Sequence, residues 1–276
     1  MKKALLVVCA MLAFTGSAFA KPLGLQLRSQ SALIMDARGG QVLFQKNADN
    51  VMPIASITKL MTAMVVLDAK LPLDKEIVIE ADDVDVLKNT RSRLRLGTSY
   101  TRGDLLRLAL MSSENRAAAA LGRTYPGGRR AFVIAMNRKA AKLGMRDTYF
   151  VDSTGLSSVN VSTARDLGKM VRAANGYNLI REFSTTAKHA VTYGNTSRPV
   201  HYVNSNHLVR SSKWDIGISK TGFLSEAGRC LVMHANIKGK PVVIVLLDSL
   251  GKNTRIGDAN RIKKWIETGF TRKVRG

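Results

Sequence analysis

The stretch of the chain that decides its fold is residues 53–63, which read PIASITKLMTA. It opens a helical pattern over residues 57–69, so Ser56 and Lys59 lie three positions apart on one face. A serine hydroxyl is a weak nucleophile unless a neighbouring base takes its proton. Lysine acts as that base only when its amine is neutral, and burial or a nearby positive charge lowers the lysine pKa. The stretch therefore predicts a nucleophile and its base at the start of a helix.

Two further short motifs follow this pair in the chain. They are Ser113-Glu114-Asn115 and Lys220-Thr221-Gly222. The first follows an apolar helical run at residues 105–110, and the second lies in a strand-like run at residues 216–224. Each motif is weak when taken singly, because Ser-x-x-Lys recurs at Ser249 and Ser-x-Asn recurs at Ser158. Their order and their placement on helix start, helix end and strand make the joint pattern strong.

The residue types of these motifs suit acyl transfer. Ser113 stands where a hydroxyl passes a proton between Lys59 and a leaving amine, and Asn115 is suited to hydrogen-bonding a substrate peptide. Lys220 supplies a positive charge that lowers the pKa of Lys59, and with Thr221 it holds a carboxylate or an acyl carbonyl. A glycine next to them, Gly222, permits close approach of backbone to the site.

Strand-like runs occupy both ends of the chain, and helical patterns fill the middle. We expect strands at 32–35, 41–45, 216–224, 230–237 and 241–247, and helices at 57–69, 105–110, 117–120, 129–143, 163–174 and 258–268. The turn at residues 36–40 joins the first two strands as a hairpin. The pattern predicts an α/β fold, with one antiparallel sheet sandwiched by helices and a mainly helical lobe. The catalytic cleft is expected between sheet and lobe.

The first twenty residues read as a secretory signal peptide. Lys2 and Lys3 precede a short apolar run at residues 4–14, and a small-x-small site ends at Ala20. We expect cleavage there, a periplasmic location, and a single catalytic domain over residues 21–276.

After cleavage Cys230 is the one remaining cysteine, and its strand-like surroundings favour a place in the core. A net charge of +23 falls to +21 without the two lysines, which favours anionic lipid or acidic wall polymers as peripheral partners. Export from the cytoplasm disfavours nucleic acid as a partner.

The chain resembles the low-molecular-mass penicillin-binding proteins, which are D-alanyl-D-alanine peptidases. It is most similar to their endopeptidase type, often called penicillin-binding protein 7. The resemblance spans about residues 31–270 and includes residues 53–63 and the segments MSSENRAA, DSTGL, NVSTA, NHLV and KTGF.

This resemblance implies roles for the site residues. Ser56 forms the acyl-enzyme, Lys59 acts as base, and Ser113 and Asn115 line the cleft. The residues implied in substrate binding are Asn115, Lys220, Thr221, Gly222 and Phe223. The backbone N–H groups of Ser56 and Phe223 form the oxyanion hole. The implied substrates are peptidoglycan stem peptides, with β-lactams as covalent inhibitors and no metal or organic cofactor. The glutamate of the second motif, Glu114, resembles the endopeptidase pattern more than the carboxypeptidase pattern. A carboxypeptidase activity, which removes terminal D-alanine, stays open as the alternative.

Three rival interpretations remain. A class A β-lactamase needs a glutamate for deacylation, and no glutamate occurs between Asn115 and Glu182. A basic, non-catalytic wall-binding protein fits the charge but not the full motif set. A histidine-based triad or metal site lacks the required motifs.

The Ser-, Gly- and Asn-rich segment at 150–162 either borders the site or is a plain connection between helices.

Overall fold

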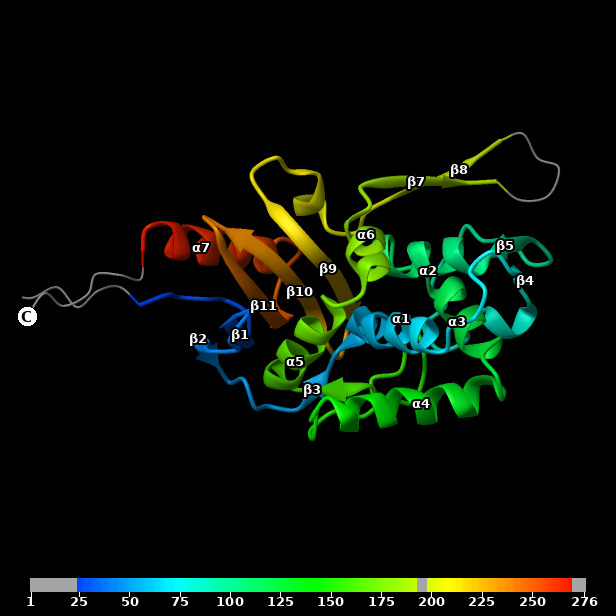
Figure 1. Ribbon diagram of the computed structural model, residues 1–276, viewed down its shortest axis with the longest axis horizontal. Helices are drawn as coiled ribbons and strands as arrows, with labels where there is room; N and C mark the ends of the chain where they lie inside the picture. The colour runs from blue at the N-terminus through cyan, green and yellow to red at the C-terminus, as the bar shows by residue number, and fades with distance from the viewer. Residues whose placement is uncertain (1–23, 193–197, 270–276) are drawn as a thin grey trace, which may run out of the picture.

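A five-stranded antiparallel sheet forms the centre of the molecule in the computed structural model, which describes residues 24–192 and 198–269 (Figure 1). The strand order is β2-β1-β11-β10-β9. Their bounds are β1 (Ser31–Asp36), β2 (Val42–Lys46), β9 (Asp215–Leu224), β10 (Gly228–Ile237) and β11 (Lys240–Ser249). The predicted hairpin and the three C-terminal strands are therefore confirmed as one sheet built from both ends of the chain. The predicted signal peptide lies outside the described residues.

The central strand β11 explains why helices cover both faces of this sheet. Its side chains alternate between two separate cores because successive residues of a strand point to opposite faces. Val243, Val245 and Leu247 belong to the core shared with α5 (Ala164–Ala174) and the helical lobe. Val242, Ile244 and Leu246 belong to the core under α7 (Thr254–Glu267). The sandwich of sheet and helices expected from the sequence is confirmed.

The helical lobe surrounds α1 (Thr58–Asp68), which is buried along nearly its whole length. The other helices of the lobe are α2 (Arg102–Met111), α3 (Asn115–Arg123), α4 (Gly128–Lys142) and α6 (Asn178–Thr185). In Figure 1, α4 runs along the side of the lobe next to α1, and α2 and α3 lie at the end away from the sheet. A helix that is apolar all round needs such neighbours on every side. None of the helices in residues 24–192 and 198–269 is long and apolar enough to cross a membrane.

Three small two-stranded sheets and three short helices complete the described chain. Their bounds are β3 (Met52–Pro53) with β6 (Val161–Ser162), β4 (Glu76–Val78) with β5 (Ser99–Thr101), β7 (Lys188–Val191) with β8 (Val200–Val203), and the 3₁₀ helices η1 (Ala55–Ile57), η2 (Ala81–Asp83) and η3 (His207–Arg210). The β7–β8 hairpin extends beyond α2 in Figure 1.

The structure departs from the sequence-based expectation in a few places. Ser56 lies in the 3₁₀ turn η1, one turn before α1, and not in the first turn of the helix itself. The last helix begins at Thr254, four residues earlier than predicted from its apolar positions. Helix α6 and the three two-stranded sheets were not predicted, because each of these elements is shorter than the sequence window in which hydrophobic periodicity is informative. Cys230 is buried in the core, as predicted.

Candidate active site

Lys59 is the most enclosed charged group of the site. Its side chain is fully buried, and its Nζ lies 2.8 Å from Ser56 Oγ, 2.7 Å from Asn115 Oδ1 and 2.6 Å from the carbonyl oxygen of Thr154. The turn η1 and the first turn of α1 hold Ser56 and Lys59 on the same side, as their spacing predicts. When the amine loses its proton, its lone pair is within reach of the Ser56 hydroxyl.

Burial tunes Lys59 toward that neutral state. Burial lowers the pKa of Lys59 from its usual 10.5 to about 7. The nearby carboxylates of Asp152, Glu114 and Asp85 raise this pKa but offset only part of the effect of burial. An ordinary surface lysine is almost fully protonated at neutral pH, whereas this one is neutral about half of the time at pH 7. The site therefore contains a base whose pKa is matched to neutral pH.

A second buried lysine holds Ser113. Lys220 Nζ lies 2.8 Å from Ser113 Oγ and 2.7 Å from the carbonyl oxygen of Thr221. Burial, followed by the nearby charges of Lys59 and Arg255, lowers the pKa of Lys220 well below its usual value. Ser113 adopts φ of +63° in the turn between α2 and α3, a left-handed conformation rare for a residue with a Cβ. Such strain is found where a side chain must be aimed at a function.

Strand β9 passes directly against the turn that carries Ser56. A Cβ on Gly222 would lie 3.0 Å from the Ile54 carbonyl oxygen and 3.2 Å from the Ser56 nitrogen, so any larger residue would push the turn of Ser56 away from β9. Its neighbour Phe223 is about half exposed at the mouth of the site. On the other side of Gly222, Thr221 Oγ1 forms a hydrogen bond of 2.7 Å with Ser205 Oγ.

The segment at residues 150–162, which the sequence left undecided, borders the site. The Asp152 carboxylate accepts hydrogen bonds from Thr154 N at 2.6 Å, Gly155 N at 2.6 Å and Asn160 Nδ2 at 2.6 Å. These bonds fix the loop so that the Thr154 carbonyl faces Lys59. Gly155 has φ of +78°, and a Cβ there would lie 2.0 Å from the Ala55 carbonyl oxygen. An aspartate followed two and three residues later by Thr and Gly is typical of such a self-bonded loop, and that signal was available in the sequence.

Arg255 is a functional candidate that no motif in the sequence indicates. It lies at the start of α7, and its Nη1 is 3.5 Å from the Gly222 carbonyl oxygen. Its Nε is buried without a hydrogen-bond partner. The guanidinium therefore adds a permanent positive charge behind β9.

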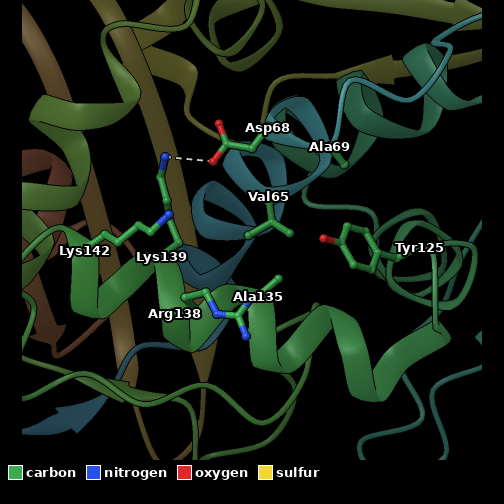
Figure 2. A pocket seen from close by; sticks show the side chains of 8 residues that line it. All are labelled: Val65, Asp68, Ala69, Tyr125, Ala135, Arg138, Lys139 and Lys142. Atoms are coloured by element: carbon green, nitrogen blue, oxygen red, sulfur yellow. Dashed lines mark hydrogen bonds and ion pairs between the residues drawn. The ribbon is translucent and has the colours of Figure 1, made fainter.

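The predicted site residues fall into two connected groups. Ser56, Lys59 and Asn115 form the first, and Ser113, Lys220 and Thr221 form the second, with Gly222 against the turn of Ser56. A hollow of about 410 Å³ opens beside Ser113 and Asn115. A smaller hollow of about 190 Å³ lies between α1 and α4 and contains none of the predicted residues (Figure 2). Among residues 24–192 and 198–269, no three His, Cys, Asp or Glu side chains gather as a metal site would require.

The helix-covered antiparallel sheet and the pairing of Ser56 with the buried Lys59 define a serine-type hydrolase of the β-lactamase and transpeptidase fold class. The family model described as D-alanyl-D-alanine carboxypeptidase matches residues 16–251. The chain is 50% identical to the D-alanyl-D-alanine endopeptidase of Pseudomonas aeruginosa over 90% of its own length and 80% of that protein. It is 50% identical to the protein of the same name from Escherichia coli, over 88% of this chain and 79% of that one. The chain therefore belongs to the D-alanyl-D-alanine carboxypeptidase family of serine peptidases.

Solved structures agree with this assignment. The crystal structure of a Streptomyces DD-transpeptidase superimposes with a TM-score of 0.81 at 30% identity, and the match covers 89% of this chain and 98% of that one. The D-alanyl-D-alanine carboxypeptidase of Mycobacterium tuberculosis superimposes with a TM-score of 0.79 at 26% identity, over 92% and 96% of the two chains. The predicted fold class and the predicted class of enzyme are both confirmed.

Proposed function

We propose that the protein is a peptidoglycan DD-endopeptidase that cuts D-alanyl cross-links through an acyl-enzyme on Ser56. The observation that carries the chemistry is the buried Lys59 amine, 2.8 Å from Ser56 Oγ and with its pKa lowered to about 7. The endopeptidase activity is supported by the names of the two relatives that are 50% identical to this chain.

The proposed acylation carries one proton, by relays, from Ser56 to the leaving amine and replaces a C–N bond by a C–O bond. Neutral Lys59 takes the proton of Ser56, and Oγ attacks the carbonyl carbon of the D-alanyl residue. The carbonyl oxygen becomes an oxyanion, which the backbone N–H groups of Ser56 and Phe223 stabilise. The C–N bond then breaks as Ser113 gives its proton to the leaving amine, and the proton that Lys59 took from Ser56 replaces it by way of Lys220, whose Nζ lies 2.8 Å from Ser113 Oγ. Lys59 is then neutral again and takes a proton from the water that attacks the ester. Water hydrolyses the resulting ester and returns Ser56 to its starting state.

The remaining residues hold the substrate in this scheme. The Asn115 amide bonds the peptide backbone, and Lys220 and Thr221 face the carboxylate or acyl carbonyl that lies along β9. Gly222 supports this role because its missing side chain lets β9, and the residues that face the substrate along it, lie directly against the turn of Ser56. Arg255 supplies charge to the same end of the strand.

β-Lactams act on this family as covalent inhibitors, and we propose that this enzyme releases them slowly. Of the three carboxylates between Asn115 and Glu182, Asp152 is bonded within its own loop, and Asp166 accepts hydrogen bonds from Asp147 N and Thr148 Oγ1. Neither is free to activate a water for deacylation.

Digestion of purified peptidoglycan by the mature protein tests the function. Cross-linked dimers should disappear with wild-type enzyme and persist with Ser56→Ala, while labelled penicillin should bind covalently only to the wild type. Loss of terminal D-alanine from pentapeptide stems with dimers intact would instead establish the carboxypeptidase alternative. Penicillin labelling that survives in Ser56→Ala would refute the assignment of the nucleophile.

We also propose export to the periplasm by cleavage after Ala20, leaving residues 21–276 as the catalytic domain. The charged start, the short apolar run and the small-x-small site support it. The surplus of basic residues supports peripheral contact with anionic lipid or acidic wall polymers. N-terminal sequencing of protein from a periplasmic extract checks the cleavage site, and Lys21 as the first residue is the expected result.

A further inference from the structure

The hollow of about 410 Å³ beside the second motif has walls that the proposed acyl transfer does not use. It is lined by Arg91, Ser92 and Arg93 on one side, by the turn of residues 112–115 on the other, and by Tyr202 of β8. The turn includes Ser113 and Asn115, so this hollow is continuous with the candidate active site.

The groups in this hollow have unused capacity to bind a peptide. Arg91 is exposed and makes no hydrogen bond or ion pair with any residue in 24–192 or 198–269. Glu114 is 8% exposed and forms no ion pair within 4.0 Å in the same part of the chain, and its carboxylate accepts one long hydrogen bond there, of 3.3 Å from Arg116 N. Tyr202 is 1% exposed, and its hydroxyl is buried without a hydrogen-bond partner. A buried polar group left unpaired is costly unless a ligand or water completes it.

Arg93 is different because it already has contacts. Its guanidinium lies 4.1 Å from the centre of the Tyr202 ring and donates a hydrogen bond to the His201 carbonyl. It therefore anchors the tip of the β8 strand to the loop of residues 91–93 and forms a fixed wall. Arg91 is left as the free cation of the hollow.

The position of this hollow identifies which part of a substrate it would take. In the proposed mechanism Ser113 gives its proton to the leaving amine, so the chain attached to that amine runs past Ser113. For a carboxypeptidase that leaving group is a single D-alanine, and little space is needed. For an endopeptidase it is a second stem peptide, which needs room and carries free carboxylates.

We propose that this hollow is the subsite for the leaving stem peptide, with Arg91 pairing with a carboxylate of that stem and Glu114 accepting a peptide N–H. This proposal rests on the proposed endopeptidase function and gives a structural reason for it. Arginine pairs with a carboxylate through two parallel hydrogen bonds, which fixes orientation as well as charge. Removing that contact should weaken binding of the cross-linked substrate and leave the acylating groups in place.

Steady-state kinetics on a purified cross-linked peptide dimer test the subsite. The variants are Arg91→Glu, Arg91→Lys and, as a matched control, Arg138→Glu, an exposed charge reversal on α4 beside the other hollow (Figure 2). Arg91→Glu should lower kcat/KM for the dimer about tenfold, mainly through KM, which is the effect of about one charge-assisted contact. Arg91→Lys should recover much of the loss, and Arg138→Glu should stay within about twofold of wild type.

Two further measurements distinguish a failure of the proposed subsite from a failure of the proposed endopeptidase function. Amidation of the carboxylates of the leaving stem should lower kcat/KM of the wild-type enzyme, and on that amidated dimer Arg91→Glu should cause little further loss. The rate of acylation by labelled penicillin, which has no second stem, confirms that the variants are folded and active. Equal kcat/KM of wild type and Arg91→Glu on the dimer would overturn the subsite alone. If wild type is acylated by penicillin but does not cleave the dimer, the endopeptidase function fails and the subsite fails with it.

Discussion

The rate of acylation should follow the protonation of Lys59 and should fall steeply in mild acid. With the pKa of Lys59 lowered to about 7, its neutral fraction is about 0.9 at pH 8 and about 0.01 at pH 5. If the neutral amine is the base, the acylation rate constant drops about ninetyfold over this interval. A stopped-flow or gel measurement with fluorescent penicillin at saturating and limiting concentrations gives this profile directly. A rate that is flat from pH 5 to pH 8, or a midpoint near the ordinary lysine pKa of 10.5, would refute the assignment of Lys59 as base.

Asp152→Asn sharpens this test because the direction of the shift can be worked out. The Asp152 carboxylate is the largest of the charges that raise the pKa of Lys59 against burial. Removing its charge should lower the pKa of Lys59 further, so the acid limb of the profile should move to lower pH. Asp147→Asn, which removes an exposed carboxylate just before this loop, is the matched control and should leave the limb in place. A merely structural role for Asp152 predicts a lower rate at every pH with the limb unmoved.

Three other outcomes follow from the structure. Gly222→Ala places a methyl group 3.2 Å from the Ser56 nitrogen and should slow penicillin acylation about tenfold or more, whereas Gly24→Ala, with open space around its Cβ position, should not. Asp258→Ala should destabilise the fold by about 3 kcal/mol at pH 7 in thermal or denaturant unfolding, because Ser29 N and Ser29 Oγ then lose a buried acceptor at 2.7 and 2.6 Å. Burial raises the pKa of Asp258, but hydrogen bonds from Ser29 and the neighbouring backbone outweigh it and lower the pKa, so the destabilisation should be present above about pH 4 and shrink as pH falls through the lowered pKa. A chromogenic β-lactam should give a burst of about one product per active site and then slow turnover, and sustained rapid hydrolysis would contradict the proposed slow deacylation.

The sequence predicted the sheet well because its strands carry strong local signals. Residues 241–247 are a continuous apolar run, which is typical of a strand buried on both faces, and β11 lies at the sheet centre. The turn at residues 36–40 has the glycines that a hairpin needs, and Gly40 adopts φ of +76°. Local chemistry of this kind is readable from one sequence.

The candidate site was only partly predictable. Ser56, Lys59 and the two triplets carry motifs, so their side chains were identified before their distances were known. Thr154 contributes its backbone carbonyl to Lys59. Every residue type has a backbone carbonyl, so the sequence does not show which residue supplies it. Arg255 comes from a helix 35 residues beyond Lys220, and only the packing of α7 against the sheet brings it to Gly222. Arg91 lies in an irregular segment whose place depends on the β7–β8 hairpin, which the sequence did not predict.

The two buried lysines of the site do not compete equally for a proton. Burial lowers the pKa of both, but carboxylates lie near Lys59 and restore part of its affinity for a proton. Lys220 instead faces Lys59 and Arg255, and both positive groups lower its pKa further. Lys59 therefore takes up a proton before Lys220 does. In the empty site Arg255 carries the permanent positive charge behind β9, because a guanidinium stays protonated.

This order of protonation connects substrate binding to the chemistry of the leaving group. A carboxylate that binds beside β9 brings a negative charge, which raises the pKa of Lys220. Lys220 can then take up a proton while it stays 2.8 Å from Ser113 Oγ. The proton that Ser113 needs to replace the one given to the leaving amine is thus available at the moment when a carboxylate-bearing substrate is bound. Lys220→Arg, which keeps a charge but cannot deliver its proton, should therefore slow acylation by peptides and by labelled penicillin alike, because the nitrogen of the C–N bond that breaks needs a proton in both.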